Sequence, residues 1–401
     1  MPRYDFTQTL PRHGGDSLKW NKYAGRDILP LWVADMDFAA PPAVREALAA
    51  RLAEGVYGYG TVPPGLNEIV RAYLAREYDW QIAPEWIVWL PGLVPGLNLA
   101  CRAVSGGILT ATPVYPPFLS APSFSNRKRH TVALVLEEGR WRWDFAAFAA
   151  ALDALDENSL FLLCHPHNPV GRAWEEKELR DIGNLCLARG ITICSDEIHC
   201  DLVLDEGRKH RPFATLGEEF ASRTITLMAP SKTYNIPGLG CAFAVISNPE
   251  LRHRFQGVMR GIVPDANIFG FVACAAAFKD CEDWHQELLA SLRGHREFVR
   301  ASIAEMPLLA TTPVEATYLA WIDARPLAER LERKFGAASP LANPARFFEE
   351  HGVGLSDGAA FAPETAFGNE GKNWLRLNFG CPRATLEAAL ERMRKAMATV
   401  G

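Results

Sequence analysis

Short apolar runs alternate with helical stretches through the middle of the chain. The apolar runs lie at 86–90, 131–136, 159–164, 191–197 and 224–230, and helical patterns at 94–104, 145–155 and 176–190 follow the first three. Runs of this length without polar alternation are typical of strands that are buried on both faces. The pattern therefore predicts an α/β domain with a mainly parallel sheet.

The two ends of the chain show a different pattern. The first 30 residues are polar and rich in turn formers, which fits an arm or lid laid over the body and also fits a disordered tail. Helical spacing follows at 41–55 and 65–79, and helices dominate again beyond about residue 280. We therefore expect three parts: an arm that contributes to the small domain at 1–45, a large domain at 46–285 and a small α+β domain at 286–401.

Composition and charge narrow the possible partners. The 401 residues are 48% hydrophobic and 22% charged, with a net charge of -5, so the chain carries no global positive field for nucleic acid or anionic lipid. No apolar run reaches the roughly 20 residues of a membrane helix, and the first residues show no signal-peptide core. The nine cysteines form no CxxC pair. We expect a cytoplasmic protein with reduced thiols that meets acidic small molecules in a pocket.

A lysine follows the last of the apolar runs in an unusual setting. Lys232 lies in SKTYNIPGLG, a turn rich in glycine and proline, where a solvated helix lysine is not expected. A lysine in apolar or cationic surroundings loses its proton more easily, which is the requirement for forming an imine with an aldehyde. Taken alone, however, a lysine is most often a surface group.

Two more polar residues follow neighbouring apolar runs. Asp196 closes the run ITICSD, and Asn168 lies in the HNPVG turn after SLFLLC. The carboxyl ends of parallel strands meet at one edge of a sheet, so these side chains and Lys232 should lie together. A carboxylate can keep a pyridine nitrogen protonated and an amide can bind a phenolate oxygen, so the set fits pyridoxal 5′-phosphate. A helix cap for Asp196 and a plain turn for Asn168 are the simpler alternatives.

A phosphate site is predicted at a third strand end. The segment WIVWLPGLVPG contains a strand, a glycine turn and a helix start, so the backbone N–H groups of Leu93 and Val94 can bind a phosphate. Ser231 beside the lysine can add a contact. Tyr115, in ATPVYPPF, can stack on the pyridine ring, although core packing is an equally good explanation. A glycine turn before a helix is a weak signal without the other residues.

Two other cofactors fit the sequence less well. A dinucleotide-binding motif needs a third glycine, but Gly238 and Gly240 are followed by Phe243 at that place. A zinc site from His165, His167 and His199 lacks the spacing of zinc enzymes. We therefore expect no metal.

The motifs taken together resemble those of fold-type I pyridoxal-phosphate enzymes in the class I/II aminotransferase superfamily. Within it, the chain is most similar to the cystathionine β-lyase or cysteine C–S lyase subgroup, the MalY/PatB type. The resemblance covers nearly the whole chain through WVADMDF, VYGYG, ATPVYPPF, HPHNPVGRAW, SDEIHCDLVL, APSKTYNIPGLG and WLRLNFGCPR. It implies the aspartate aminotransferase fold, with a mainly parallel seven-stranded sheet in the large domain.

The resemblance also implies roles for single residues. Lys232 matches the lysine that binds the cofactor, Asp196 the partner of the pyridine nitrogen, and Asn168 the phenolate-oxygen donor that also borders the substrate. Arg376 matches the arginine that binds the substrate α-carboxylate, and Tyr115 matches the stacking aromatic. Tyr59 resembles a tyrosine that reaches the cofactor of the neighbouring subunit, which implies a homodimer with shared active sites.

The chain departs from the aminotransferase pattern at two places. His199 stands where many aminotransferases have a tyrosine, and NIPGLG replaces the usual phosphate-binding arginine. Both differences favour α,β-elimination from a cysteine-type substrate, which releases a thiol, pyruvate and ammonia. An aminotransferase shares the early steps and remains the main alternative. A regulatory protein that keeps the fold is a more remote one.

Overall fold

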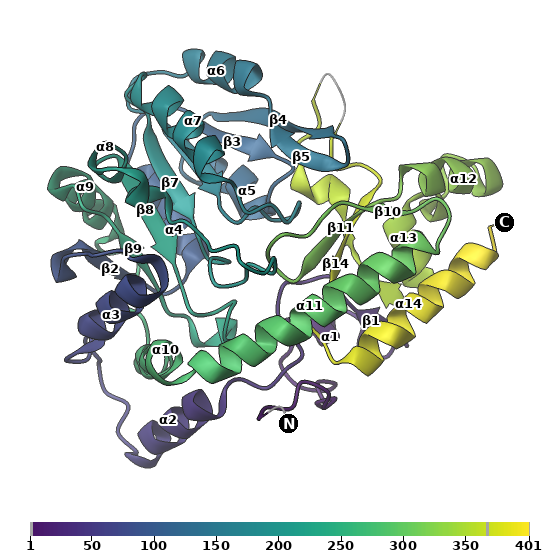
Figure 1. Ribbon diagram of the computed structural model, residues 1–401, viewed down its shortest axis with the longest axis horizontal. Helices are drawn as coiled ribbons and strands as arrows, with labels where there is room; N and C mark the ends of the chain where they lie inside the picture. The colour runs from purple at the N-terminus through teal and green to yellow at the C-terminus, as the bar shows by residue number, and fades with distance from the viewer. Residues whose placement is uncertain (1–2, 366–368, 401) are drawn as a thin grey trace.

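The computed structural model describes residues 3–365 and 369–400 (Figure 1). Its largest element is an eight-stranded sheet with the order β2-β9-β8-β7-β6-β3-β4-β5. In that order the strands are Ile87–Leu90, Ala242–Val245, Thr224–Met228, Thr192–Asp196, Leu160–Cys164, Ile108–Thr112, Arg129–Glu137 and Arg140–Trp143. Only β9 and β5 run against the common direction. The mainly parallel sheet is therefore confirmed.

The sheet has one strand more than the expected seven. The additional strand, β5, forms an antiparallel hairpin with β4. Glu138 and Gly139 connect the two strands, and both have a positive φ, 50° and 75°. A two-residue turn with this backbone geometry matches the natural twist of a hairpin. The sequence RWRW is too short and too highly charged to be recognised as a strand from its pattern alone.

Helices cover both faces of the sheet. On one face lie α4 (Leu93–Arg102), α5 (Pro116–Phe124) and α9 (Pro249–Met259). On the other lie α6 (Phe145–Asp153), α7 (Glu176–Leu187) and α8 (Glu218–Ala221). Every residue of β3, β6, β7 and β8 is buried. These strands have apolar partners on both sides, which explains why they lack polar alternation.

A third group of helices packs at the β2 end of the sheet. The helices are α2 (Pro42–Ala53), α3 (Leu66–Tyr78) and α10 (Ile268–Asp280), and α10 contacts both of the others. The first two agree with the predicted helices at 41–55 and 65–79 to within two residues. Short helical turns, η1 (Pro84–Trp86), η2 (Phe213–Leu216) and η3 (Pro237–Leu239), connect the larger elements.

A second, smaller sheet organises the carboxyl-terminal part of the chain. Its order is β10-β11-β14-β13, with all neighbours antiparallel. The strands are Ala310–Thr311, Leu319–Asp323, Trp374–Asn378 and Ser356–Asp357. Around it lie α11 (Glu282–Ala304), α12 (Arg325–Phe335), η4 (Pro340–Ala342), α13 (Pro344–Glu350), η5 (Gly358–Phe361) and α14 (Arg383–Ala398) (Figure 1).

The N-terminal segment joins this smaller part. It contains α1 (Leu18–Asn21) and β1 (Leu29–Pro30), and β1 pairs with β12 (Val353–Gly354) in parallel. The first 30 residues, apart from the two that lie outside the described ranges, therefore form an arm packed on the body, and this favours the arm over the tail. We keep domain boundaries near residues 45 and 285 as a proposal. Within the described ranges, no helix combines the length and the apolar character that crossing a membrane requires.

Candidate active site

Three strands of the large sheet deliver polar side chains to one cavity. Lys232 follows the end of β8, Asp196 ends β7, and Asn168 follows the end of β6, and these three strands are parallel neighbours. They line a cavity of about 220 Å³. Eight residues predicted for the site line it: Leu93, Val94, Tyr115, Asn168, Asp196, His199, Ser231 and Lys232. The sheet edge therefore brings together residues that are far apart in sequence.

Lys232 is only partly exposed to solvent, and protein atoms surround its ammonium group. Burial and, to a smaller extent, the nearby Arg376 lower the pKa of Lys232 to about 8, against the opposing effect of Asp35 and Asp196. The Lys232 amine donates a hydrogen bond to the backbone oxygen of Ala34. Such a lysine reaches its neutral, nucleophilic form far more readily than a solvated one.

This pKa leads to a prediction about cofactor capture. Imine formation requires the neutral amine, so the rate at which the apoprotein binds pyridoxal phosphate should rise with pH through about 8. An ordinary lysine would give the same rise near its usual value of 10.5. Stopped-flow absorbance between about pH 6 and about pH 11, a range that includes both midpoints, measures the rate. A midpoint near the ordinary lysine value would contradict the assigned environment.

Asp196 and His199 supply a buried acid and a neutral imidazole. Burial raises the pKa of Asp196 to about 7, against the hydrogen bond that Ile198 N–H donates to its Oδ1 at 3.2 Å. In the described chain Asp196 forms no ion pair, so a cation such as a protonated pyridine nitrogen would favour its charged form. Burial lowers the pKa of His199 to about 3, and its Nδ1 is buried without a partner. Both residues fit a ring ligand with polar edges.

The opposite part of the cavity is suited to an anion. Leu93 and Val94 begin α4, and N-terminal backbone N–H groups at these positions have no acceptor within the helix. Gly92 precedes them without a side-chain cap, so the helix end stays open to a ligand. Ser231 lines the same cavity, but no arginine does. The residues present can therefore hold a phosphate through backbone N–H groups and the helix dipole.

Arg376 reaches the site from the smaller sheet. It lies on β14, and its Nη1 donates to Asn168 Oδ1 at 3.0 Å while Nη2 donates to Trp32 O at 2.9 Å. Burial lowers its pKa to about 10, which still leaves the group charged near neutral pH. Its buried Nε has no hydrogen-bond partner among the described residues. A guanidinium group that still has unpaired N–H donors can bind a carboxylate in bidentate fashion beside Asn168.

Tyr59 and Arg376 are the predicted site residues that do not line this cavity, and of the two only Arg376 contacts a residue that does, Asn168. Tyr59 lies elsewhere. It follows α2 in an irregular segment, and its side chain is fully exposed. Within one chain it therefore has no route to Lys232. Its assignment to a partner subunit stays a prediction.

Sequence reasoning missed the backbone oxygen of Ala34. This oxygen accepts hydrogen bonds from Lys232 and from the hydroxyl of Tyr318, the latter at 2.9 Å. Ala34 lies in the segment WVADMDF, which was recognised as a family motif. A residue pattern cannot show, however, that the backbone carbonyl group of one of its residues will face a particular lysine. The N-terminal arm thus forms one wall of the site.

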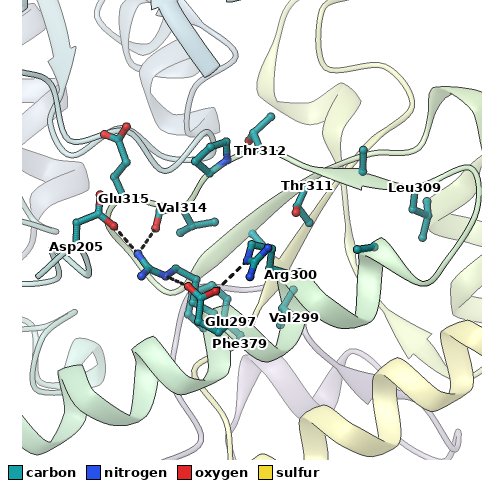
Figure 2. Close-up of a pocket in the computed structure, with 15 residues that line it drawn as sticks. Asp205, Glu297, Val299, Arg300, Leu309, Thr311, Thr312, Val314, Glu315 and Phe379 are labelled. Atoms are coloured by element: carbon teal, nitrogen blue, oxygen red, sulfur yellow. Dashed lines mark hydrogen bonds and ion pairs between the residues drawn. The ribbon is translucent and has the colours of Figure 1, made fainter. Parts of the chain in front are cut away.

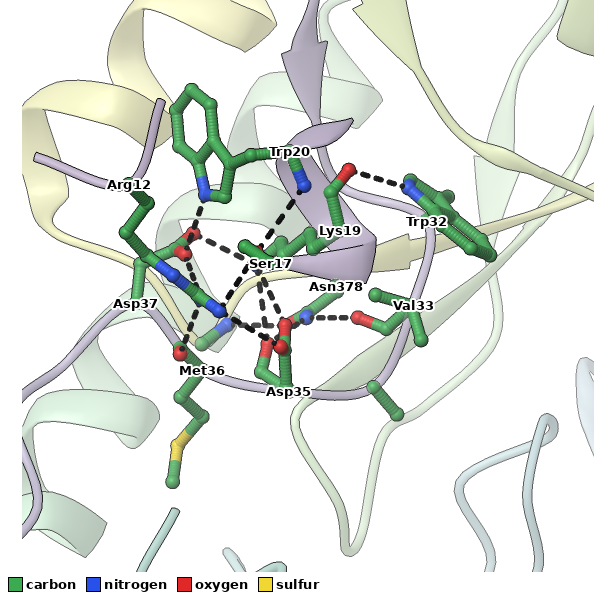
Figure 3. Close-up of polar contacts among 12 residues, drawn as sticks. Arg12, Ser17, Lys19, Trp20, Trp32, Val33, Asp35, Met36, Asp37 and Asn378 are labelled. Carbon is green, nitrogen blue, oxygen red and sulfur yellow. Dashed lines mark hydrogen bonds and ion pairs between the residues drawn. The ribbon is translucent and has the colours of Figure 1, made fainter. Parts of the chain in front are cut away.

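A buried charge network holds this wall in place (Figure 3). Lys19 Nζ lies 2.8 Å from Asp37 Oδ2 and donates to Asp35 O at 3.1 Å. Arg12 pairs with Asp35 at 3.1 Å and with Asp37 at 2.6 Å. Asn378, at the end of β14, donates to the backbone oxygens of Val33 and Asp35 (Figure 3). These contacts join the arm to the strand that carries Arg376.

Replacement of Lys19 by methionine should destabilise the protein. Removing one partner of a buried ion pair leaves an uncompensated charge, which costs about 3 to 5 kcal/mol. Lys19 is fully buried, so methionine fills its space but leaves Asp37 with Arg12 as its only cation, beside the indole N–H of Trp20. Thermal melting measures the loss, and Lys177→Met, at an exposed ion pair with Asp181, is the control. Equal melting temperatures for the two variants would contradict a structural role of the network.

The remaining histidines of the motifs serve the scaffold. His165 Nε2 contacts Arg211 O at 3.1 Å, and His167 Nε2 contacts Pro113 O at 2.8 Å. In the described ranges, no group of three or more potential metal ligands comes together. The adjacent Glu197 accepts hydrogen bonds from Ser195 and from Phe213 N–H, which anchors the loop after β7.

Another cavity, of about 530 Å³, lies between α11 and the smaller sheet (Figure 2). None of the predicted site residues lines it. Arg296 pairs there with Asp205 at 2.6 Å and with Glu297 at 3.1 Å, and Arg300 pairs with Glu297 at 2.9 Å. Because these charged side chains are paired with one another, they are less available to bind a ligand than the polar groups of the Lys232 cavity.

Comparisons with known proteins agree with this geometry. The family model "Aminotransferase class I and II" matches residues 26–393. The chain is 34% identical to cystathionine β-lyase PatB of Bacillus subtilis, over 98% of this chain and 100% of that protein. It is 42% identical to a crystal structure of OvoB, with a TM-score of 0.90 and coverage of 99% and 100%. Cystalysin from Treponema denticola, whose structure contains pyridoxal 5′-phosphate, is 30% identical with a TM-score of 0.89 and coverage of 99% and 100%.

These similarities extend over essentially the full length of each relative, so they include both sheets and the N-terminal arm. Lys232 and Asp196 line the cavity at the places that the motifs indicated, and Arg376 reaches its border through the hydrogen bond to Asn168. The chain therefore belongs to the class I and II aminotransferase family, in the branch that includes the PatB-type cystathionine β-lyases.

Proposed function

We propose that this protein is a pyridoxal-phosphate-dependent C–S lyase. It would cleave cystathionine or related cysteine S-conjugates by α,β-elimination to a thiol, pyruvate and ammonia. The observation that carries the proposal is Lys232, whose pKa is lowered to about 8 and which shares one cavity with Asp196 at the carboxyl edge of the sheet. The relatives named cystathionine β-lyase and the cofactor in cystalysin support it.

The cavity residues divide into groups that would hold the cofactor. Lys232 would bind its aldehyde carbon, Asp196 its pyridine nitrogen, and Asn168 and His199 its phenolate side. The N–H groups that begin α4 and the hydroxyl of Ser231 would bind its phosphate, and Tyr115 would stack on its ring. When bound, pyridoxal phosphate supplies an electron-withdrawing ring that stabilises negative charge at the substrate α-carbon.

The chain's own residues orient the substrate and move its proton. Arg376 binds the α-carboxylate, and its hydrogen bond to Asn168 fixes the direction of the guanidinium group. Lys232 is buried next to this position and, as a neutral amine, takes the proton from the α-carbon. Loss of that proton allows the C–S bond at the β-carbon to break, with the electron pair leaving on sulfur as a thiolate.

We further propose a cytoplasmic homodimer with shared active sites. Tyr59 has no contact role in its own chain, and several neighbouring apolar side chains are also exposed, namely Leu52, Val56, Tyr57 and Ile262. An exposed apolar patch of this kind is typical of a protein interface. Sedimentation at several concentrations tests the dimer, and mixing Tyr59→Phe with Lys232→Ala subunits tests sharing of the sites.

The function is tested by incubating the purified holoenzyme with cystathionine. The expected result is stoichiometric release of pyruvate and ammonia, with a change in the visible spectrum when the substrate is added. The aminotransferase alternative predicts instead that the cofactor is recovered as pyridoxamine phosphate when a keto acid is supplied. Absence of pyruvate from a protein with intact cofactor would overturn the lyase proposal.

A further inference from the structure

A third cavity, of about 480 Å³, adjoins the candidate active site. Tyr115 lines both this cavity and the cavity of Lys232, and Arg376 lines this one. Its remaining walls come from the N-terminal arm, from the start of α5, from α13, and from β13 and η5. A substrate held by Arg376 would therefore have space beyond its reacting end, where the chain attached to sulfur could lie.

Most charged side chains around this cavity already have partners. Glu349 forms ion pairs with Arg26 at 3.1 Å and with Arg346 at 3.4 Å. Asp357 accepts hydrogen bonds from the side chain of Asn343 at 2.7 Å and from a backbone N–H. Glu349, Asp357 and Arg346 therefore already have polar partners within the chain.

Lys22 differs from these groups. Its ammonium lies 4.5 Å from the ring centroid of Trp32 and 5.0 Å from that of Tyr23. In the described part of the chain it makes no direct ion pair. Burial lowers the pKa of Lys22, and the nearby Glu349, already paired with two arginines, opposes this only in part. Cation–π contacts hold the ammonium in place without neutralising its charge. The cavity therefore presents a positioned positive charge that is free to meet an anion.

Trp32 connects Lys22 to Arg376. The backbone oxygen of Trp32 accepts from Arg376 Nη2 at 2.9 Å and from Ser356 Oγ at 2.6 Å. Its indole Nε1 donates to Lys19 O at 3.0 Å, which fixes the ring on which Lys22 rests. One residue thus contacts both cations, and both line the same cavity.

We propose that Lys22 binds a carboxylate on the leaving group of the substrate. This inference rests on the proposed lyase function and names a substrate class within it: cysteine thioethers whose sulfur carries a chain ending in a carboxylate. Arg376 would bind the α-carboxylate and Lys22 the distal one, while Leu355 and Phe361 line the cavity between them as apolar walls. Lys22 acts as a specificity residue and takes no part in bond breaking.

The test compares two substrates on the same holoenzyme. Cystathionine carries a distal carboxylate, whereas S-ethylcysteine does not. Lys22→Met keeps the apolar stem over Trp32 but removes the charge, and Lys22→Arg keeps the charge. For Lys22→Met we expect kcat/KM for cystathionine to fall about fivefold, as for a partly exposed ion pair, through a higher KM. The value for S-ethylcysteine should stay unchanged, and Lys22→Arg should keep most of the wild-type preference.

Salt gives a second readout on the wild-type protein. Added salt screens exposed charges, so it should reduce the preference for cystathionine in wild type but not in Lys22→Met. Lys177→Met, at an exposed lysine remote from both cavities, is the matched control. If both substrates change equally in Lys22→Met, or if neither changes, the role of Lys22 is overturned.

Binding measurements separate this inference from the lyase proposal. Titrating the visible spectrum of the holoenzyme with each compound gives a dissociation constant whatever reaction follows. If wild type releases no pyruvate but Lys22→Met binds cystathionine more weakly than wild type does, the lyase proposal is refuted and the carboxylate site is supported. If binding of cystathionine is equal in the two proteins, the carboxylate site falls.

Discussion

Lys232→Ala is expected to lose essentially all release of pyruvate from cystathionine. The variant lacks both the amine that would bind the cofactor aldehyde and the base that would take the α-proton. A general base alone contributes about 10²- to 10⁴-fold to a rate, so the combined loss should exceed this range. Continuous assay of pyruvate with a coupled dehydrogenase measures the effect, and mass spectrometry after borohydride reduction should find the pyridoxyl label on Lys232 in wild type only.

The controls for this variant distinguish chemistry from folding. Lys177→Ala removes an exposed lysine and should keep full activity. Removing the buried ammonium should not lower the melting temperature of the apoprotein, because burial already disfavours its charge. A small external amine such as methylamine should restore part of the proton transfer. Label on a different lysine, or wild-type rates in Lys232→Ala, would refute the assignment on which the proposed function depends.

Asp196→Asn is expected to lower kcat by about 10²- to 10³-fold, the range found when one preorganised electrostatic group is removed. The substitution keeps the shape of the side chain but removes the charge that would keep the pyridine nitrogen protonated. The ring would then withdraw electrons less strongly from the α-carbon. Because the change affects the transition state more than binding, KM should change far less than kcat.

The spectrum and a matched variant make this second prediction specific. Asp181→Asn removes an exposed aspartate whose partner is Lys177, and it should behave like wild type. In Asp196→Asn the cofactor should still bind, with its visible absorption band shifted and its pH dependence altered. An equal loss of activity and of bound cofactor would instead indicate that Asp196 serves only to hold the pocket together. Unchanged kcat would rule out its pairing with the pyridine nitrogen.

Local pattern was sufficient for the sheet and for the residues at its edge. Strands β6, β7 and β8 are short, apolar and buried on both faces, so their ends could be recognised from the chain itself. Lys232, Asp196 and Asn168 each follow such an end, and parallel strands place their ends side by side. The roles of Arg376 and Tyr59 had no such local signal and came from the family resemblance.

Contacts between distant segments needed the tertiary structure. The bond between Arg376 and Asn168 joins residues 208 positions apart, and the one from Lys232 to Ala34 O spans 198 positions. Periodicity reports which face of an element is apolar, but it does not report which other element will cover that face. The charge on Lys22 likewise became informative only once its position over Trp32 was known.

The sequence by itself thus determined the fold class, the buried strands and the lysine, aspartate and asparagine at their carboxyl ends. The tertiary structure decided how the arm closes the cavity, how β14 brings Arg376 to it, and where β5 extends the sheet. The physical reason is that strand and turn formation depends on neighbours within a few residues, whereas the positions of the arm and of Arg376 depend on packing and ion pairing between segments hundreds of residues apart. The hairpin strand β5 is local, but its short charged sequence has no apolar pattern that would reveal it.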